Sequence, residues 1–319
     1  RTPEDWLFKA YFDGVLVDVL HRINGVPVDS VLLAGAVVRD VLAISMPVLT
    51  PDAVITQKLL TLNELSGGRS TILIGGLGHS VTRVTGLEPV RRVTAVRDTL
   101  RILKGLRPDA MLNYEGELYS LKNYQAEWAT QPAPRIYAGA TFSKMLRMAA
   151  GVADGTMMSD VPLQRMPEVM GWAGEGLAAS GRQRADFRMN NFMAWHVKED
   201  RAAAIAEARR ELIWRGLLMT WFTELFLDPA DAAMVEAKRP AFLQAFLGRT
   251  DRIEGVPEPV IDKLVENMTL TGDLRDVGRI VQKLKALEAA GLDEVALRLH
   301  DDPEEALRVI GERLVPAFA

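Results

Sequence analysis

The chain of 319 residues contains no cysteine. This absence excludes disulfide bonds, thiolate catalysis and metal sites that use cysteine ligands. An excess of positive charge is also absent, because 38 basic residues stand against 42 acidic residues and the net charge is −4. With a pI near 5.7, the composition argues against a general nucleic-acid-binding protein, so we expect no nucleic-acid partner.

Long uncharged hydrophobic runs are absent as well. The most apolar long stretch, residues 212–227, is interrupted by Arg215 and Glu224, and it is too short and too charged to predict a membrane span. Residues 1–11 lack the apolar core of a signal peptide. We therefore expect a soluble, cytoplasmic protein without a membrane partner. The hydrophobic content of 48% is ample for a large core.

The first 50 residues allow two interpretations. Thr2-Pro3-Glu4-Asp5 has the residue types of a helix start, and apolar residues at helical spacing then predict a helix that ends at Ile23. This interpretation makes Val28–Val38 a buried strand and leaves Leu42–Leu49 as a second apolar run. The alternative places a strand at Gly14–Leu20 and a helix at Ser30–Val41. We prefer the first interpretation because of its helix cap.

From Thr50 onward, predicted strands and helices alternate, which indicates a parallel sheet covered by helices. No internal repeat or linker appears, so we predict one domain over residues 1–319, with an irregular helical insertion at about 228–272 and a small hairpin at Met111–Tyr124. A (β/α)8 barrel and a doubly wound sheet both fit. Position 81 is Val, so the dinucleotide-binding fingerprint fails and the barrel is favoured. The predicted strands are Val31–Val38, Thr71–Gly75, Arg135–Gly139, Gly155–Ser159, Phe187–His196 and Glu294–Leu299.

Three of the four histidines lie at the ends of predicted strands: His79, His196 and His300. In a parallel barrel the carboxyl ends of all strands face one way, and the active site is built there. The ordinary alternative is that each imidazole only hydrogen-bonds a loop, and for His300 this alternative is preferred. The fourth, His21, is expected at the surface. The spacing of the histidines matches no metal motif, so we predict no metal site.

A glycine-led turn offers a second candidate site. Gly139-Ala140-Thr141 leaves a predicted strand, and a predicted helix begins at Ser143. Small residues allow close approach to the backbone, the free amides of a helix start bind phosphate, and Lys144 adds positive charge. The alternative is an ordinary strand-to-helix turn. Residues 75–80 form a similar exit, and two such exits on one barrel face indicate a large ligand that carries phosphate.

Four stretches resemble the bacterial luciferase-like superfamily in order and spacing. They are "TLNELSGGR" (61–69), "ILIGGLGHSVT" (72–82), "RIYAGATFSKMLRMAAGVADG" (135–155) and the segment 260–297. Within the superfamily, the chain is most similar to the methylene-tetrahydromethanopterin reductase branch, which uses the deazaflavin coenzyme F420. The likeness covers most of the chain from Thr50 onward.

The resemblance implies a (β/α)8 barrel with a flavin or deazaflavin at its carboxyl-terminal face. Transferred by position, residues of three segments surround the cofactor: the end of the third strand, the loop after the fourth, and the phosphate-binding turn after the fifth. These residues are Ala36 and Val37, where relatives often have a non-proline cis peptide, then Gly76, Leu77, Gly78 and His79, and then Gly139, Ala140, Thr141, Ser143 and Lys144.

The chain also departs from the family pattern. His79 stands where relatives commonly have an acidic residue, and extra residues lie between Val37 and Thr61. The first strand, first helix and second strand of the family are not recognised before Thr2. The N-terminal strands are therefore expected to be missing or divergent.

The resemblance implies an oxidoreductase that transfers a hydride between coenzyme F420 (8-hydroxy-5-deazaflavin) and a small organic substrate. In this interpretation His196 or His79 donates or orients a proton. One alternative is a luciferase-like monooxygenase that uses FMN, and another is a barrel without catalytic activity that binds a flavin or a partner. The aromatic residues within 214–226 have three possible places: a pocket, a dimer surface, or the core. We expect a homodimer.

Overall fold

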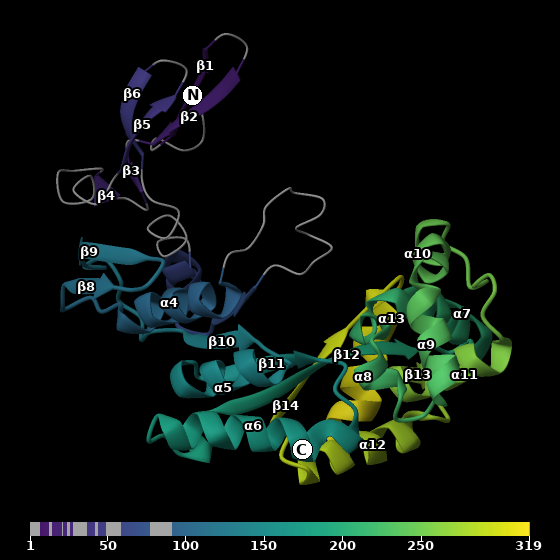
Figure 1. The fold of residues 1–319 in the computed structure, drawn as a ribbon. Helices are drawn as coiled ribbons and strands as arrows, with labels where there is room; N and C mark the ends of the chain where they lie inside the picture. Colours follow the sequence, from purple (N-terminus) through teal and green to yellow (C-terminus); the bar gives the residue numbers. More distant parts are fainter. Residues whose placement is uncertain are drawn as a thin grey trace. The chain divides into compact units, whose positions relative to one another are not determined.

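A computed structural model describes residues 59–76 and 91–318 in full, and it describes the backbone of six strands between Leu7 and Val48. The chain divides into two compact units. The first comprises residues 1–138 and 152–154, and the second comprises 139–151 and 155–319. The colours of Figure 1 run from purple and blue in the first unit to teal, green and yellow in the second.

The N-terminal strands form three antiparallel pairs, so the predicted helix from Thr2 to Ile23 is wrong. The runs at 7–12 and 15–20 contain many aromatic and β-branched residues, which favour strands, and the Asp13-Gly14 dipeptide between them is a strong hairpin signal. The strand that the alternative placed at Gly14–Leu20 agrees with the structure, but its helix at Ser30–Val41 does not, because Val37–Val41 forms a strand. The pairs are β1 (Leu7–Phe12) with β2 (Val15–Leu20), β3 (Arg22–Ile23) with β4 (Val26–Pro27), and β5 (Val37–Val41) with β6 (Ile44–Val48).

The predicted parallel strand at Val31–Val38 is also not found as such. Residues 28–36 lie outside the described residues, and Val37 begins β5, which pairs antiparallel with β6. The apolar run Leu42–Leu49, predicted separately, contributes β6. Two short apolar runs next to each other in sequence pair more readily as a hairpin than through a long crossover connection.

From residue 59 onward, the described part of the first unit agrees with the predicted alternation of strands and helices and with the predicted hairpin. A helix includes residues 59–65 and ends where Gly67 and Gly68 adopt left-handed φ angles of 63° and 78°. The hairpin predicted at Met111–Tyr124 is confirmed, and the amide of Gly116 donates to the carbonyl of Tyr119 at its turn. The remaining elements are β7 (Thr71–Gly75), α4 (Arg92–Gly105), β8 (Leu112–Glu115), β9 (Ser120–Tyr124) and β10 (Arg135–Gly139).

The motif "TLNELSGGR" has a structural role in this unit. The side-chain amide of Asn63 donates to the carbonyl of Pro132 at 2.8 Å. The carboxylate of Glu64 accepts from the amides of Thr130 and Gln131, both at 2.7 Å. These bonds fix the loop that leads into β10.

The second unit contains a parallel sheet in which β12 (Arg188–Val197) is central. Beside it lie β11 (Gly155–Ser159), β14 (Glu294–Arg298) and the short β13 (Leu270–Gly272), all parallel to it. Eight of the ten residues of β12 are buried, as expected for a strand covered on both faces. The strands predicted at 155–159, 187–196 and 294–299 are therefore confirmed. The helices are α5 (Ser143–Val152), α6 (Met166–Ala179), α7 (Arg201–Glu211), α12 (Val277–Ala289) and α13 (Pro303–Val309).

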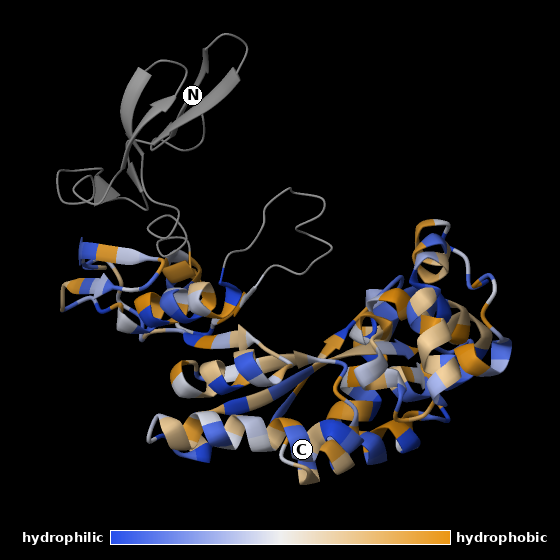
Figure 2. Ribbon diagram, in the orientation of Figure 1, coloured by the Kyte–Doolittle hydropathy of each residue, from blue (hydrophilic) through white to orange (hydrophobic). Residues whose placement is uncertain are grey.

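The helices of this unit carry both hydrophobic and hydrophilic residues, as expected when one face lies against a sheet (Figure 2). Asp302 caps α13 through its carboxylate, which accepts from the amide of Glu305. Gly291 ends the segment after α12 with a φ of 102°. Among the residues that the structure describes, no helix is long and apolar enough to cross a membrane.

The helical insertion begins earlier than predicted, at residue 212, and it builds a hydrophobic core of its own together with the end of α7. Phe222 is buried in this core, and Trp214 packs edge-on against Phe246 with ring centroids 5.2 Å apart. Of the three places considered for these aromatic residues, the core is observed for Phe222, while Trp214, Trp221 and Phe226 pack against it as half-buried side chains. The helices are α8 (Thr220–Thr223), α9 (Pro229–Ala237), α10 (Arg239–Leu247) and α11 (Glu258–Met268), preceded by the short 3-10 segments η3 (Leu212–Trp214) and η4 (Gly216–Leu218).

The spacing of apolar residues over 199–227 is typical of one long helix, but helix α7 ends at Glu211. Gly216, Leu217 and Leu218 have φ angles of 52°, 51° and 52°, in the left-handed region. Apolar spacing does not reveal such a turn. It costs each leucine roughly 1–2 kcal/mol, so other contacts must hold it.

Candidate active site

Three chemically active side chains follow the parallel strands of the second unit at one edge. The strands are in parallel register, with Ser159 opposite Phe192 and Ala194 opposite Arg298. Asp160 follows β11, His196 is the next-to-last residue of β12, and His300 follows β14. Carboxyl ends of parallel strands are where α/β folds place ligands and catalytic groups, so this edge is the candidate active site.

His196 is held by a glutamate of helix α7. Its Nδ1 lies 2.7 Å from Oε2 of Glu207, and the imidazole is only 1% exposed. Burial lowers the pKa of His196, although the hydrogen bond to Glu207 opposes this shift. A carboxylate can only accept, so Nδ1 carries the proton and Nε2 has the free electron pair. No hydrogen-bond partner of His196 Nε2 is found among the described residues.

Glu207 is the most strongly bonded carboxylate of this group. Burial alone would raise the pKa of Glu207, but hydrogen bonds from His196 and Lys198 outweigh burial and lower it to about 2. Lys198 Nζ lies 3.0 Å from Oε1, and the amide of Asp301 donates to the same oxygen at 3.1 Å. Glu207 is therefore charged at neutral pH and fixes the orientation of the His196 ring.

His300 stacks on His196. The ring centroids are 4.4 Å apart, and the planes differ by 18°. His300 Nδ1 lies 3.6 Å from Oε2 of Glu211, which is one helical turn beyond Glu207 on α7. Burial, followed by the neighbouring His196 and Arg298, lowers the pKa of His300 to about 3. The edge therefore carries two neutral imidazoles next to two carboxylates, and His300 does not merely hydrogen-bond a loop, as the sequence had favoured.

A buried ion pair lies at the end of β11. Arg215 Nη1 donates to Oδ1 of Asp160 at 3.0 Å, and both side chains are at most 2% exposed. The amide of Gly216 donates to Oδ2 of Asp160 at 2.9 Å. The amide of Asp160 itself donates to the carbonyl of Phe192 in β12. Asp160 thus connects the edge of the sheet to the left-handed turn of the insertion.

The turn after β10 has the form that the sequence predicted for a phosphate site. Ala140 is bonded to β11 twice, because its amide donates to Met157 and its carbonyl accepts from the hydroxyl of Thr156 at 2.9 Å. Thr141 Oγ1 accepts from the amide of Ser159 at 3.1 Å. Helix α5 begins at Ser143, as predicted, and its first turn contains no acidic residue. The residues present therefore fit a phosphate group.

Aromatic side chains of the insertion pack against this turn. Phe142, which is 40% exposed, contacts the ring of Trp221 edge-on at 5.2 Å and that of Phe222 at 6.3 Å. The guanidinium of Arg165 lies 4.7 Å from the centre of the Trp221 ring and donates to the carbonyl of Trp221 at 2.8 Å. Helix α8 is thereby held against the residue that precedes the α5 helix start.

The structure describes some of the predicted site residues and not others. Lys144 is exposed in the first turn of α5, Gly139 is half-buried at the end of β10, and Gly76 is exposed after β7. Val37 is described only as backbone of β5. Outside the described residues lie Ala36, Leu77, Gly78 and His79. Whether His79 and His196 share a pocket therefore stays a prediction.

Sequence reasoning missed the glutamates beside the histidines, Glu207 and Glu211, and the nearby charged residues Asp160, Arg215 and Arg298. The spacing of Glu207 and Glu211 is the one signal that could have found two of them, because residues four apart share a helix face. Within residues 59–76 and 91–318, no group of three or more metal-ligating side chains has the arrangement of a metal site.

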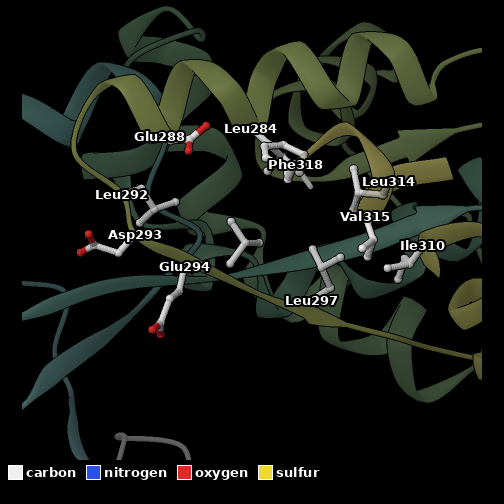
Figure 3. A pocket seen from close by; sticks show the side chains of 11 residues that line it. Leu284, Glu288, Leu292, Asp293, Glu294, Leu297, Ile310, Leu314, Val315 and Phe318 are labelled. Atoms are coloured by element: carbon white, nitrogen blue, oxygen red, sulfur yellow. The ribbon is translucent and has the colours of Figure 1, made fainter. Parts of the chain in front are cut away.

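Away from this edge, a pocket of about 360 Å³ lies between α12, β14 and the C-terminal segment. Figure 3 shows Glu288, Asp293 and Glu294 at one end of the pocket and apolar side chains such as Leu314 and Phe318 at the other. Val295 and Leu297 line it. Side chains alternate along a strand, so Arg298 faces the opposite side, toward Glu211. This pocket is separate from the histidine pair.

The comparisons with known proteins agree with this architecture. A family model described as luciferase-like monooxygenase matches residues 11–303. The chain is 27% identical over 265 residues to 5,10-methylenetetrahydromethanopterin reductase of Archaeoglobus fulgidus, covering 80% of this chain and 76% of that protein. It is 30% identical over 184 residues to F420-dependent glucose-6-phosphate dehydrogenase of Kineococcus radiotolerans, covering 54% of this chain and only 53% of the relative.

Solved structures show the same fold. The coenzyme F420 dependent tetrahydromethanopterin reductase of Methanopyrus kandleri matches with a TM-score of 0.66 and 20% identity, over 85% of this chain and 80% of that chain. An F420-dependent secondary alcohol dehydrogenase matches with a TM-score of 0.63 and 18% identity, over 84% and 76%. The predicted α/β fold of the luciferase-like barrel type is confirmed. The chain belongs to the family of luciferase-like monooxygenases.

Proposed function

We propose that the protein is an oxidoreductase that transfers a hydride between coenzyme F420 and a small organic substrate. One observation carries this proposal: a glycine-led turn before a helix start and a buried histidine pair lie at one edge of the sheet, in a chain similar to a protein named as F420-dependent. When bound, the cofactor supplies the hydride chemistry. The residues of this chain bind it, orient the substrate and exclude water.

The turn after β10 would hold the phosphate of the cofactor. Gly139, Ala140 and Thr141 lead to the α5 helix start at Ser143, and Lys144 adds a positive charge beside it. The cofactor wall predicted from the resemblance includes Gly76, Leu77, Gly78 and His79, together with Ala36 and Val37. That wall remains a proposal, because most of it lies outside the described residues.

The proposed catalytic residues are His196 and His79. In His196 the Nδ1 proton is held by Glu207, so Nε2 is the atom that accepts a proton. An imidazole that is neutral at pH 7 suits a proton acceptor next to a hydride transfer. His196 is buried, so we assign it to proton exchange and orientation and not to the binding of the cofactor.

An FMN-dependent monooxygenase is the second candidate, and the description of the family itself favours it. The two cofactors are distinguished by the absorption spectrum of the purified protein and by titration with F420 and FMN. Oxidised FMN shows two bands in the blue and near ultraviolet, whereas the deazaflavin shows one band near the violet edge. We expect saturable binding of F420, and consumption of its visible band in the presence of a reducing substrate. Purification with FMN bound, and no binding of F420, would contradict the proposal.

We further propose a single luciferase-like domain over residues 1–319 that forms a homodimer, acts on small molecules and is cytoplasmic. The match of one family model to residues 11–303 supports the single domain. Light scattering during size-exclusion chromatography tests the dimer: a mass near 35.2 kDa would show a monomer. A non-catalytic barrel is the remaining alternative, and failure to bind either cofactor would favour it.

A further inference from the structure

We propose that Asp160 is a positioning residue that, through Arg215 and Gly216, holds Trp221 of the insertion against Phe142 at the phosphate-binding turn. No sequence motif suggested Asp160, and the proposed reaction does not use it. The assignment of the turn to a cofactor phosphate rests on the proposed function. The positioning itself rests only on the contacts described below.

The first step is the turn that has to be held. Gly216, Leu217 and Leu218 all have left-handed φ angles, which L side chains rarely adopt. Gly216 also lies so close to the ring of Phe222 that a Cβ added there would be 2.5 Å from Cδ2 of that ring. The turn therefore sets the place of the segment that follows it, which contains Trp221.

The second step is what holds the turn. Both carboxylate oxygens of Asp160 are used, one by Arg215 and one by the amide of Gly216. Asp160 itself has a φ of 55°, and its amide is bonded to Phe192 in the sheet. A buried charge pair of this kind seldom adds net stability, but it can specify one arrangement. Here it fixes the start of the insertion to the carboxyl end of β11.

The third step is what the turn positions. Trp221 lies five residues after Gly216 and places its ring edge-on against Phe142, 5.2 Å away. Phe142 directly precedes Ser143, where α5 begins. Loosening the Asp160 contacts is therefore expected to move Trp221 away from the turn. The aromatic rings of Trp221 and Phe222 then no longer pack against Phe142, which directly precedes the free amides at the start of α5.

The test compares Asp160→Asn with Glu224→Gln. Glu224 is an exposed carboxylate on the same segment and does not contact the left-handed turn. Its partner Arg165 keeps its own bond to the carbonyl of Trp221 when Glu224 is neutralised, so Glu224→Gln is the matched control. Hydrogen exchange is measured by mass spectrometry across the whole chain. In Asp160→Asn we expect at least tenfold faster exchange at the amides of Leu218, Met219 and Phe222, which are bonded within the segment, and little change elsewhere in the second unit.

A second readout follows the ligand site. The contribution of Trp221 to fluorescence is obtained by comparison with Trp221→Phe, and F420 and FMN are titrated as probes. We expect Asp160→Asn to bind the cofactor at least tenfold more weakly, which is about 1.4 kcal/mol, and to lose the response of Trp221 to binding. Substrate turnover is expected to change mainly through KM and less through kcat, while Glu224→Gln behaves as wild type.

Three results would overturn the proposal: faster exchange spread evenly over the second unit, unchanged exchange at residues 216–223, or a locally loosened segment with unchanged cofactor affinity. If wild type binds neither F420 nor FMN, the proposed function fails instead. The positioning is then decided by the exchange pattern and by the Trp221 emission of the free proteins, and an emission identical to wild type in Asp160→Asn would refute it.

Discussion

His196 and His300 stack face to face with ring centroids 4.4 Å apart, although they come from different strands of the sheet. Each ring has a glutamate of α7 near its Nδ1, Glu207 for His196 and Glu211 for His300. Two adjacent buried imidazoles cannot both take up a proton without repulsion, and burial already disfavours the charged form. The pair is therefore neutral in the folded protein at pH 7.

This neutral pair predicts a loss of stability in acid. The pKa of His300 is about 3 in the folded protein, against 6.5 for the free residue, so between these values the unfolded chain binds more protons. The free energy of unfolding should fall as the pH decreases from 6.5 toward 3, by at most about 1.4 kcal/mol per pH unit for each such group. Urea unfolding at a series of pH values measures the slope.

The matched variant for that measurement is His300→Asn. Glu207, whose pKa is lowered from 4.5 to about 2, also loses its stabilising contribution in acid, but only below about pH 4.5. The window between pH 4.5 and 6.5 therefore separates the contribution of the histidines from that of Glu207. We expect the slope in this window to be smaller in His300→Asn, and an unchanged slope would show that the pair does not titrate as described.

His196→Ala is expected to lower turnover at least about 100-fold, while cofactor affinity stays nearly intact, because general acid–base assistance has this magnitude and His196 does not hold the phosphate. His79→Ala is expected to weaken cofactor binding first. Turnover, cofactor affinity and melting temperature are measured on the same proteins. A lower melting temperature with unchanged turnover per folded molecule would show that both histidines have only a structural role.

Gly139→Val is expected to weaken cofactor binding tenfold or more, about 1.4 kcal/mol, because a branched side chain at the end of β10 blocks approach to the backbone before α5. The measurement is a titration of the folded variant with F420 and FMN. Lys144→Met serves as a comparison that removes only the exposed charge, and we expect a smaller loss. If Gly139→Val binds the cofactor with unchanged affinity, this turn is not part of the cofactor site.

Asp98 of helix α4 is expected to be the most sensitive position among the contacts between this helix and the β8–β9 hairpin. Its buried carboxylate accepts from the amide of Leu118 at 2.8 Å and from the hydroxyl of Tyr114 at 3.1 Å. Asp98→Ala should lower the free energy of unfolding by roughly 2 kcal/mol or more, since hydrogen bonds to charged groups contribute about 1.5–3 kcal/mol. Glu117→Ala removes only an exposed partner of Arg91 and Arg97 and should cost about 1 kcal/mol or less. Equal losses in denaturant unfolding would contradict this difference.

Much of the fold could be predicted from the sequence where local signals agree. Apolar strands and capped helices alternate from Thr71 onward, and β11 and the start of α5 lie at the predicted residues. The periodicity of a buried strand and the residue preferences of helix ends are local properties, and they are readable without neighbours. The prediction for the first 50 residues failed for the same reason. A helix cap at Thr2 competed with strand-forming runs, and local preference alone favoured the wrong structure.

The candidate site was predicted only in part. The sequence identified the turn at Gly139–Ser143 and placed His196 at the end of a strand, because both signals are local. It could not pair His196 with Glu207, stack His300 on it, or join Asp160 to Arg215, because these partners come from separate elements that meet only when the sheet is assembled. Burial then decided the protonation of the histidines, since a lowered pKa depends on loss of contact with water, which no sequence pattern records.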